Sequence, residues 1–277
     1  MKPAHLTLVP SLIITLLFGL LTANINAADL LHLWTFNTDD GIDDIVGNVD
    51  SLLRGNSTLS NDQLQIPASP ADDGMQFDTG GDIDLNDLNG SEGGVSFVVW
   101  CTPTDYSDQK FIFEVGTKSF LSLNANTGPY PRGGVGTQSI VADEYSVSLS
   151  SKPTDGSGPI MLALTLTDNA DPNTDQAYIA LYTGPVTLFQ DASATNLEFV
   201  ADLGLPEDLK LLGDSTYGPY NITGSIDEFR IYGGVLTSGD IAAIAAEGPV
   251  IPEPAGLALF GLAWIAMLIH RGKHQRA

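Results

Sequence analysis

Between residue 30 and about residue 232 the chain alternates short apolar runs with clusters of Gly, Pro, Asn and Asp. Such runs, bounded by turn residues, are typical of β-strands, and many of them at this spacing predict a sandwich or a barrel. Helical periodicity is nearly absent from this region. The clearest runs read LLHLWTFN, GMQFD, VSFVVWC, KFIFEVG, PIMLALTLT, QAYIALYTG, NLEFVAD and SIDEFRIYGG.

Two of these runs alternate with the period of a half-buried strand, because successive side chains of a strand point to opposite faces. The run at 159–167 sets Ile160, Leu162, Leu164 and Leu166 against Met161, Ala163, Thr165 and Thr167. The run at 110–116 sets Phe111, Phe113 and Val115 against Lys110, Ile112 and Glu114. We expect one face of each strand to pack on the core and the other to be wetter.

One segment near the end of this region has a helical pattern instead. In LTSGDIAAIAAEG, Thr237 is placed to cap a helix and Asp240 follows three residues later, as in a capping box. The apolar stripe consists of Ile241, Ile244 and Ala245. The sequence therefore predicts a short helix that packs against the sandwich.

The chain is strongly acidic, with 34 Asp and Glu against 11 Lys and Arg and a formal charge of −23. Four of the basic residues and one acidic residue lie in the terminal segments 1–28 and 251–277, so the body keeps 7 basic and 33 acidic side chains. An acidic surface repels phosphate backbones, which argues against nucleic-acid binding.

The first 28 residues have the three-part pattern of a secretory signal peptide. Lys2 precedes an apolar stretch over residues 11–21, and small residues end in Ala27 and Ala28, after either of which cleavage is expected. The alternative is an uncleaved N-terminal anchor. Either interpretation predicts export.

Residues 250–277 contain a second transport signal. The uncharged stretch at 255–269 would be roughly 22 Å long as a helix, which is short for a typical bilayer core. A Pro-Glu-Pro triplet precedes the stretch, and basic residues after it would stay on the cytoplasmic side. The stretch fits a membrane helix better than the alternative, a buried C-terminal helix.

The order of triplet, apolar helix and basic end resembles the PEP-CTERM sorting tail of bacterial surface and secreted proteins. In that family the tail is recognised by an exosortase, a membrane transpeptidase. The resemblance implies that Pro252, Glu253 and Pro254 are recognition residues. It also implies an exosortase as a partner and membrane attachment through the helix before processing.

The region 29–249 resembles laminin G-like domains of the concanavalin A-like lectin and glucanase superfamily. The segments that carry this resemblance are LHLWTFNTDDG, GMQFDTGGDIDL and GSIDEFRIYGGVLTSGDIAAIA. It implies an all-β fold, a two-sheet antiparallel jelly-roll sandwich with a short C-terminal helix. It also implies a structural calcium ion near the rim, bound by the aspartate of the closing strand, Asp227. Asp39 and Asp40 are weaker candidates, with solvated turn residues as the alternative.

Residues for catalysis are scarce in this body. The E-x-D-x-x-E strand of the glucanases, which sets two carboxylates beside a glycosidic bond, is missing. His32 is the only histidine of the body, which excludes a multi-histidine zinc site there, and we interpret Cys101 as a core residue. We therefore expect no enzyme activity.

The sequence analysis predicts an exported cell-envelope or extracellular protein that binds a glycan or a matrix component, such as an extracellular polysaccharide. Tyr130, Tyr217 and Tyr220 lie in Gly- and Pro-rich loops and are candidates to stack on sugar rings, with local packing as the alternative. Two other functions stay open. One is a structural surface or biofilm protein without a small ligand, and the other is a glycoside hydrolase.

Overall fold

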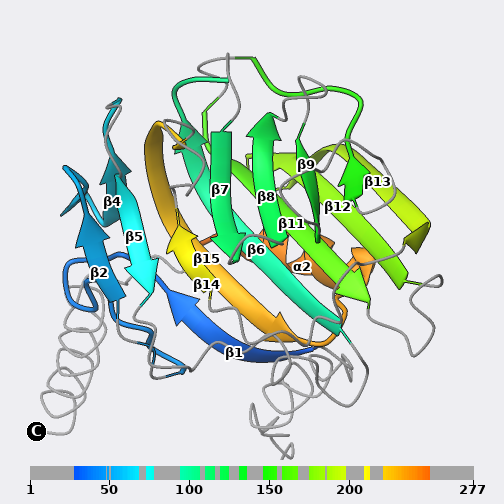
Figure 1. The fold of residues 1–277 in the computed structure, drawn as a ribbon, viewed down its shortest axis with the longest axis horizontal. Helices are drawn as coiled ribbons and strands as arrows, with labels where there is room; N and C mark the ends of the chain where they lie inside the picture. Colours follow the sequence, from blue (N-terminus) through cyan, green and yellow to red (C-terminus); the bar gives the residue numbers. More distant parts are fainter. Residues whose placement is uncertain are drawn as a thin grey trace, which may run out of the picture.

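The computed structural model shows two β-sheets packed face to face, with one helix behind the larger sheet (Figure 1). It describes residues within 28–249, except for 48, 50, 69–72, 78–93, 107–109, 116–118, 125–130, 136–145, 155–157, 168–174, 185, 198–208 and 213–220. The predicted signal peptide up to Ala27 and the sorting tail, with Pro252, Glu253 and Pro254, lie outside the described residues.

The larger sheet, which we name sheet A, has eight strands with antiparallel pairing throughout. β15 borders both β4 and β1, because its first residues pair with β4 and its last residues pair with β1. The order is β13 (Thr187–Leu197), β12 (Asp175–Thr183), β11 (Ile160–Thr167), β6 (Gly94–Pro103), β15 (Gly224–Gly233), β4 (Gln63–Ile66) and β3 (Thr58–Ser60), with β1 (Asp29–Trp34) beside β15.

The smaller sheet, sheet B, has seven strands, which are also antiparallel. Its order is β10 (Ser146–Ser148), β9 (Arg132–Val135), β8 (Ser119–Asn124), β7 (Lys110–Val115), β14 (Leu209–Leu212), β5 (Gly74–Phe77) and β2 (Ser51–Arg54). In Figure 1 sheet B lies in front of sheet A. The predicted two-sheet antiparallel sandwich is therefore confirmed.

The main core lies between the two sheets, and its centre is aromatic. The Trp34 ring meets Phe77 edge-on at 4.7 Å between centroids, and Phe97 lies 4.6 Å from Phe113. Phe229 stacks on Trp34 from the closing strand at 5.7 Å. Cys101 is fully buried in this core, as predicted.

A second apolar cluster lies between sheet A and the helix, and it corrects one prediction. The strand β11 turns Ile160, Leu162, Leu164 and Leu166 into the main core, as expected. Its other face is not wetter, because Met161 and Ala163 are buried in the second cluster. β11 is a central strand with apolar layers on both faces, and such strands do not show their burial as alternation.

The alternation predicted for 110–116 is also wrong. Ile112 and Phe113 are adjacent in sequence, yet both belong to the core between the sheets. The register against β8 shifts between Phe111 and Phe113, so a β-bulge at Ile112 interrupts the period of two. Lys110 is buried as well, and its ammonium lies 3.3 Å from a carboxylate oxygen of Asp105.

The helix α2 (Ser238–Glu247) agrees with its prediction in every respect. Thr237 is the N-cap, its hydroxyl accepts a hydrogen bond from the Asp240 amide, and the Asp240 carboxylate accepts from Thr237 in return. The buried residues of α2 are Ile241, Ile244 and Ala245. Of the helical segments that the structure describes, none combines the length and the apolar character that a membrane span requires.

Candidate functional site

Asp227, the predicted calcium ligand, lies at a β-bulge near the start of β15. The register against β6 shifts between Ile226 and Glu228, which leaves Asp227 as the extra residue. Its Oδ1 accepts a hydrogen bond of 2.6 Å from Gln63 Nε2 on β4. Its Oδ2 is buried and has no hydrogen-bond partner among the described residues. Burial raises the pKa of this carboxyl, and the bond from Gln63 opposes that shift only in part.

The two weaker calcium candidates, Asp39 and Asp40, lie in a hydrogen-bonded turn after β1. The amides of Asp39 and Asp40 donate to Asn37 Oδ1 at 2.8 and 2.7 Å. Asp40 Oδ2 accepts a hydrogen bond of 2.9 Å from the Thr35 hydroxyl and another from the Asn37 side chain. These contacts are those of an Asx-type turn, so Asp40 has a structural use whether or not a metal is present.

The described residues do not by themselves assemble a cation site around Asp227. None of them form a group of three Asp, Glu, His or Cys side chains that would hold a metal ion. Calcium takes six to eight oxygen ligands, and the described part offers one buried carboxylate oxygen without a partner at this place. The fit is therefore partial, and the calcium site stays a prediction.

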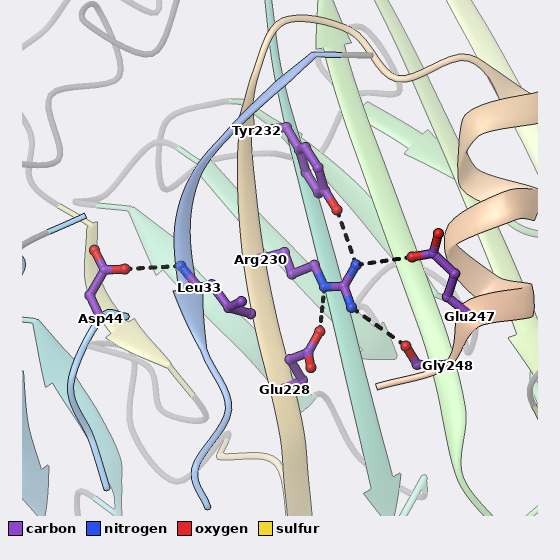
Figure 2. A network of polar contacts seen from close by, with 7 residues as sticks. All are labelled: Leu33, Asp44, Glu228, Arg230, Tyr232, Glu247 and Gly248. Carbon is purple, nitrogen blue, oxygen red and sulfur yellow. Dashed lines mark hydrogen bonds and ion pairs between the residues drawn. The ribbon is translucent and has the colours of Figure 1, made fainter. Parts of the chain in front are cut away.

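His32, the only histidine of the body, is held by Asp44. Its Nδ1 lies 2.6 Å from Asp44 Oδ2, and its ring stacks on Trp34. The other oxygen, Asp44 Oδ1, accepts hydrogen bonds from the amides of Leu33, Val46 and Gly47 at 3.0, 3.2 and 2.9 Å. Figure 2 shows the bond to Leu33. Burial opposes ionisation of Asp44, but these hydrogen bonds outweigh it and lower the pKa.

A buried polar network around Arg230 joins the closing strand to the end of α2. Glu228, Arg230 and Tyr232 point to the same side of β15, toward the end of the helix (Figure 2). Arg230 Nε pairs with Glu228 Oε1, while its other nitrogens donate to the Tyr232 hydroxyl at 3.3 Å and to the Gly248 carbonyl at 3.4 Å. Burial alone would lower the pKa of Arg230, but the ion pair with Glu228 and the hydrogen bond that Arg230 donates to Tyr232 raise it.

These contacts limit what the acidic residues of the interior can do chemically. A glycosidase needs two carboxyl groups that both reach the scissile bond. Asp227 and Glu228 are neighbours in sequence, but Glu228 is fully buried and paired with Arg230. Asp44 is equally enclosed, between His32 and three backbone amides. Among the described residues, the carboxylates of Asp44 and Glu228 are therefore held by partners within the fold.

One surface combines an aromatic ring with an accessible carboxylate. It lies on the β12–β13 hairpin, where Tyr178 is partly exposed and Asp191 is exposed. The Tyr178 hydroxyl donates a hydrogen bond of 3.0 Å to Asp191 Oδ2. Partial burial and this acidic neighbour raise the pKa of Tyr178, so the phenol stays protonated at neutral pH. Ring faces with nearby acceptors suit the apolar and hydroxyl faces of a sugar.

Sequence reasoning missed this pair. The period of two in QAYIALYTG already places Tyr178 and Tyr182 on one face of β12, but nothing local identifies Asp191 as the partner. The three tyrosines that were predicted, Tyr130, Tyr217 and Tyr220, lie outside the described residues.

Comparison with known proteins places the chain by its fold. No family model matches the sequence, and no curated protein sequence matches it. Among solved structures it is similar to domain 4 of AbnA, an extracellular arabinanase from Geobacillus stearothermophilus, in complex with arabinotriose. The TM-score is 0.51 with 18% identity, over 79% of this chain and 98% of that chain.

Two further neighbours are parts of larger chains. The binding domain of botulinum neurotoxin DC in complex with SialylT gives a TM-score of 0.54 and 14% identity, over 80% of this chain and 52% of that chain. A Trypanosoma rangeli sialidase gives 0.54 and 14%, over 80% of this chain and 33% of that chain. This protein thus spans about half of the neurotoxin domain and a third of the sialidase. The similarity to these three structures is one of fold.

Proposed function

We propose that this protein is an exported, non-catalytic binding protein whose laminin G-like sandwich attaches to a glycan or a matrix component. The observation that carries the proposal is the alignment with domain 4 of AbnA. It covers 98% of a domain that was solved with arabinotriose bound, and 79% of this chain. A fold alone does not fix function, so the binding surface has to be argued from this chain's own residues.

The Tyr178–Asp191 pair on the β12–β13 hairpin is the surface that we assign to the glycan. Its hydrogen bond fixes the hydroxyl of the ring, and a preorganised side chain loses little conformational entropy on binding. The carboxylate of Asp191 offers acceptors to sugar hydroxyl groups. An anionic site in a chain of charge −23 favours a neutral glycan over one that carries uronic acids or sialic acid.

The proposed function does not include catalysis, because the buried acidic residues already have partners within the fold. The buried carboxylates of Asp44 and Glu228 are paired with His32 and Arg230, and neither is positioned to donate a proton to a glycosidic oxygen. Binding by Tyr178 and Asp191 needs no such group. A glycoside hydrolase would have to use acids outside the described residues.

Export and sorting complete the proposal. Residues 1–28 act as the signal peptide, and an exosortase recognises Pro252, Glu253 and Pro254 in the tail. The protein is then retained at the cell envelope by the helix 255–269 or released after processing. Mass spectrometry of the protein recovered from the producing cells tests this step. A mature form that starts near Asp29 and ends near the triplet supports sorting, whereas an intact tail identifies an anchor.

A glycan array with and without calcium tests binding. We expect retention of neutral oligosaccharides by the native protein. Replacing the ring in Tyr178→Ala should weaken retention on the order of tenfold, while Tyr178→Phe, which keeps the ring, should lose less. Thr58→Ala, an exposed change at the far end of sheet A, is the matched control. Retention of no sugar under either condition would contradict glycan binding, and equal loss in all three variants would contradict the assigned surface.

A further inference from the structure

The Tyr178–Asp191 pair belongs to a longer row of polar side chains on one face of the β12–β13 hairpin, at the right-hand end of sheet A in Figure 1. Residues 176–181 and 190–195 pair without a register shift, so alternate positions of both strands share a face. The surface assigned to the glycan therefore continues beyond the pair itself. The other exposed members of this face are Gln176 on β12 and Ser193 and Thr195 on β13.

The row is longer than one sugar residue. Asp191, Ser193 and Thr195 alternate along β13, and a strand rises about 3.3 Å per residue, so their Cα atoms span about 13 Å. Gln176 lies directly opposite Thr195, and Tyr178 lies directly opposite Ser193. Side chains that face each other across two strands have Cβ atoms about 5 Å apart. The polar groups therefore form two parallel columns whose long axis follows the strands.

The row presents uncharged groups beside a single carboxylate. Serine and threonine hydroxyls and the glutamine amide each donate and accept hydrogen bonds, as the hydroxyl groups of a sugar do. Of the five residues only Asp191 is charged, and its Oδ2 already accepts the hydrogen bond from Tyr178. Such a row can contact successive units of a neutral sugar chain without burying an unpaired charge.

The opposite face of β13 holds the row in place. Ala192 and Ala194 point to that face and pack against the main core. Gln190 Oε1 accepts hydrogen bonds from the amides of Ser150 and Ser151 at 3.0 and 2.9 Å, which fastens the strand to the segment before β11. Because β13 is ordered before a ligand arrives, little conformational entropy is lost when a sugar chain binds along it.

We propose that this row binds an internal stretch of a neutral polysaccharide, laid along β12 and β13. Tyr178 stacks on one sugar unit, and Thr195 and Gln176 contact the next unit along the strands. An exposed strand face needs no free chain end, since the polymer can extend past the row in both directions. This inference rests on the proposed glycan-binding function, and it adds the preference for longer chains and the residues that set it.

Isothermal titration of the full chain with neutral oligosaccharides tests the preference for length. The probes are arabino-, xylo- and gluco-oligosaccharides, each from the monosaccharide to the tetrasaccharide, because domain 4 of AbnA was solved with arabinotriose. In the series that binds, affinity should rise roughly fivefold or more from the first to the last member. The parent polysaccharide should compete as well as the tetrasaccharide at equal concentration of sugar units, although it has far fewer ends.

Two exposed substitutions test the row itself. Thr195→Ala and Gln176→Ala should each weaken tetrasaccharide binding roughly fivefold, the effect typical of one lost hydrogen bond, and leave monosaccharide binding unchanged. Thr187→Ala is the matched control, because it removes the same side chain from an exposed position of the same strand, about 26 Å away. It should bind every member of the series as the native protein does.

The outcomes separate this inference from the function on which it rests. Equal affinity for the monosaccharide and the tetrasaccharide, or a polymer that competes only in proportion to its ends, would overturn binding along the strands and leave glycan binding intact. Equal losses in Thr195→Ala and Thr187→Ala would also overturn it. A native protein that binds no sugar of any series or array would instead contradict the proposed function, and this inference with it.

Discussion

The guanidinium of Arg230 lies over the indole ring of Trp100, 4.7 Å from its centroid. Trp100 is on β6 and Arg230 is on β15, and the two strands are neighbours in sheet A. The cation is therefore enclosed by an aromatic face, the Glu228 carboxylate and the carbonyl of Gly248 after α2. This arrangement explains the IDEFRIY segment in physical terms. Glu228, Arg230 and Tyr232 of this segment attach the closing helix to the sheet.

Removing the positive charge of Arg230 while Glu228 is kept should lower the stability of the protein strongly. In Arg230→Met the fully buried Glu228 loses its ion-pair partner, and we expect a loss of roughly 3–5 kcal/mol in the free energy of unfolding. The double variant Glu228→Leu with Arg230→Met should recover most of that loss, because no charge is then left buried. Urea unfolding of the three proteins is the measurement. A double variant no more stable than Arg230→Met would show that the charge pair is not the cause.

Asp44 should give the domain a stability that depends on pH. Its folded-state pKa is lowered, so its contribution is present above the unfolded value of about 4 and is lost as pH falls through the lowered value. Asp44→Asn should destabilise the protein by roughly 2–4 kcal/mol at pH 7, since it loses the buried carboxylate that contacts His32 and accepts hydrogen bonds from backbone amides.

The difference between native protein and Asp44→Asn should then shrink below pH 4, which urea unfolding at several pH values can follow. Asp39→Asn, at an exposed position of the neighbouring turn, is the control. If the difference in unfolding free energy stayed constant from pH 7 to pH 3, the charge of Asp44 would not be the cause of the stabilisation.

Much of the fold was accessible from local patterns. The cap, the reciprocal carboxylate and the buried stripe of α2 could be predicted because all of them lie within ten residues of each other. β13 could not be predicted, since its run TLFQDASATNL has few β-branched or aromatic residues and forms a strand because β12 pairs with it. The bulge at Ile112 is likewise set by register against β8.

The candidate sites were less accessible for a related reason. Asp227 was identified by its motif, but its partner Gln63 lies 164 residues away, and no pattern connects them. The same holds for the ring of Trp100 over Arg230. Side-chain partners across a sheet depend on strand order, and strand order cannot be predicted from the residue pattern within one strand.

The capping box of α2 offers a local measurement of stability. Thr237→Ala removes the acceptor for the Asp240 amide, and such a loss typically costs about 1 kcal/mol. Because α2 covers the second apolar cluster, amide exchange should speed up in α2 and less in the central strand β11. Ser238→Ala, an exposed change at the next position, should leave exchange unchanged. Equal acceleration in both variants would contradict a specific role of the cap.

The calcium prediction can be tested by comparing the stability of the native protein with that of Asp227→Asn. Calcium should reverse which of the two proteins is the more stable. Burial raises the pKa of Asp227, so its ionised form opposes folding, and protonation at lower pH relieves that penalty. Without metal, the neutral Asp227→Asn should therefore be as stable as the native protein at pH 7, or slightly more stable. With calcium, the carboxylate would gain a counter-charge, and the native protein should become the more stable of the two.

Melting temperatures in calcium and in chelator, measured for both proteins, decide the matter. We expect calcium to raise the melting temperature of the native protein by a few degrees and to leave Asp227→Asn nearly unchanged. Asp40→Asn is the companion variant, because Asp40 Oδ2 already accepts hydrogen bonds from Thr35 and Asn37. It should lower stability equally with and without calcium. A native protein that does not respond to calcium would remove Asp227 as a metal ligand and leave its buried oxygen as a cost of the β-bulge.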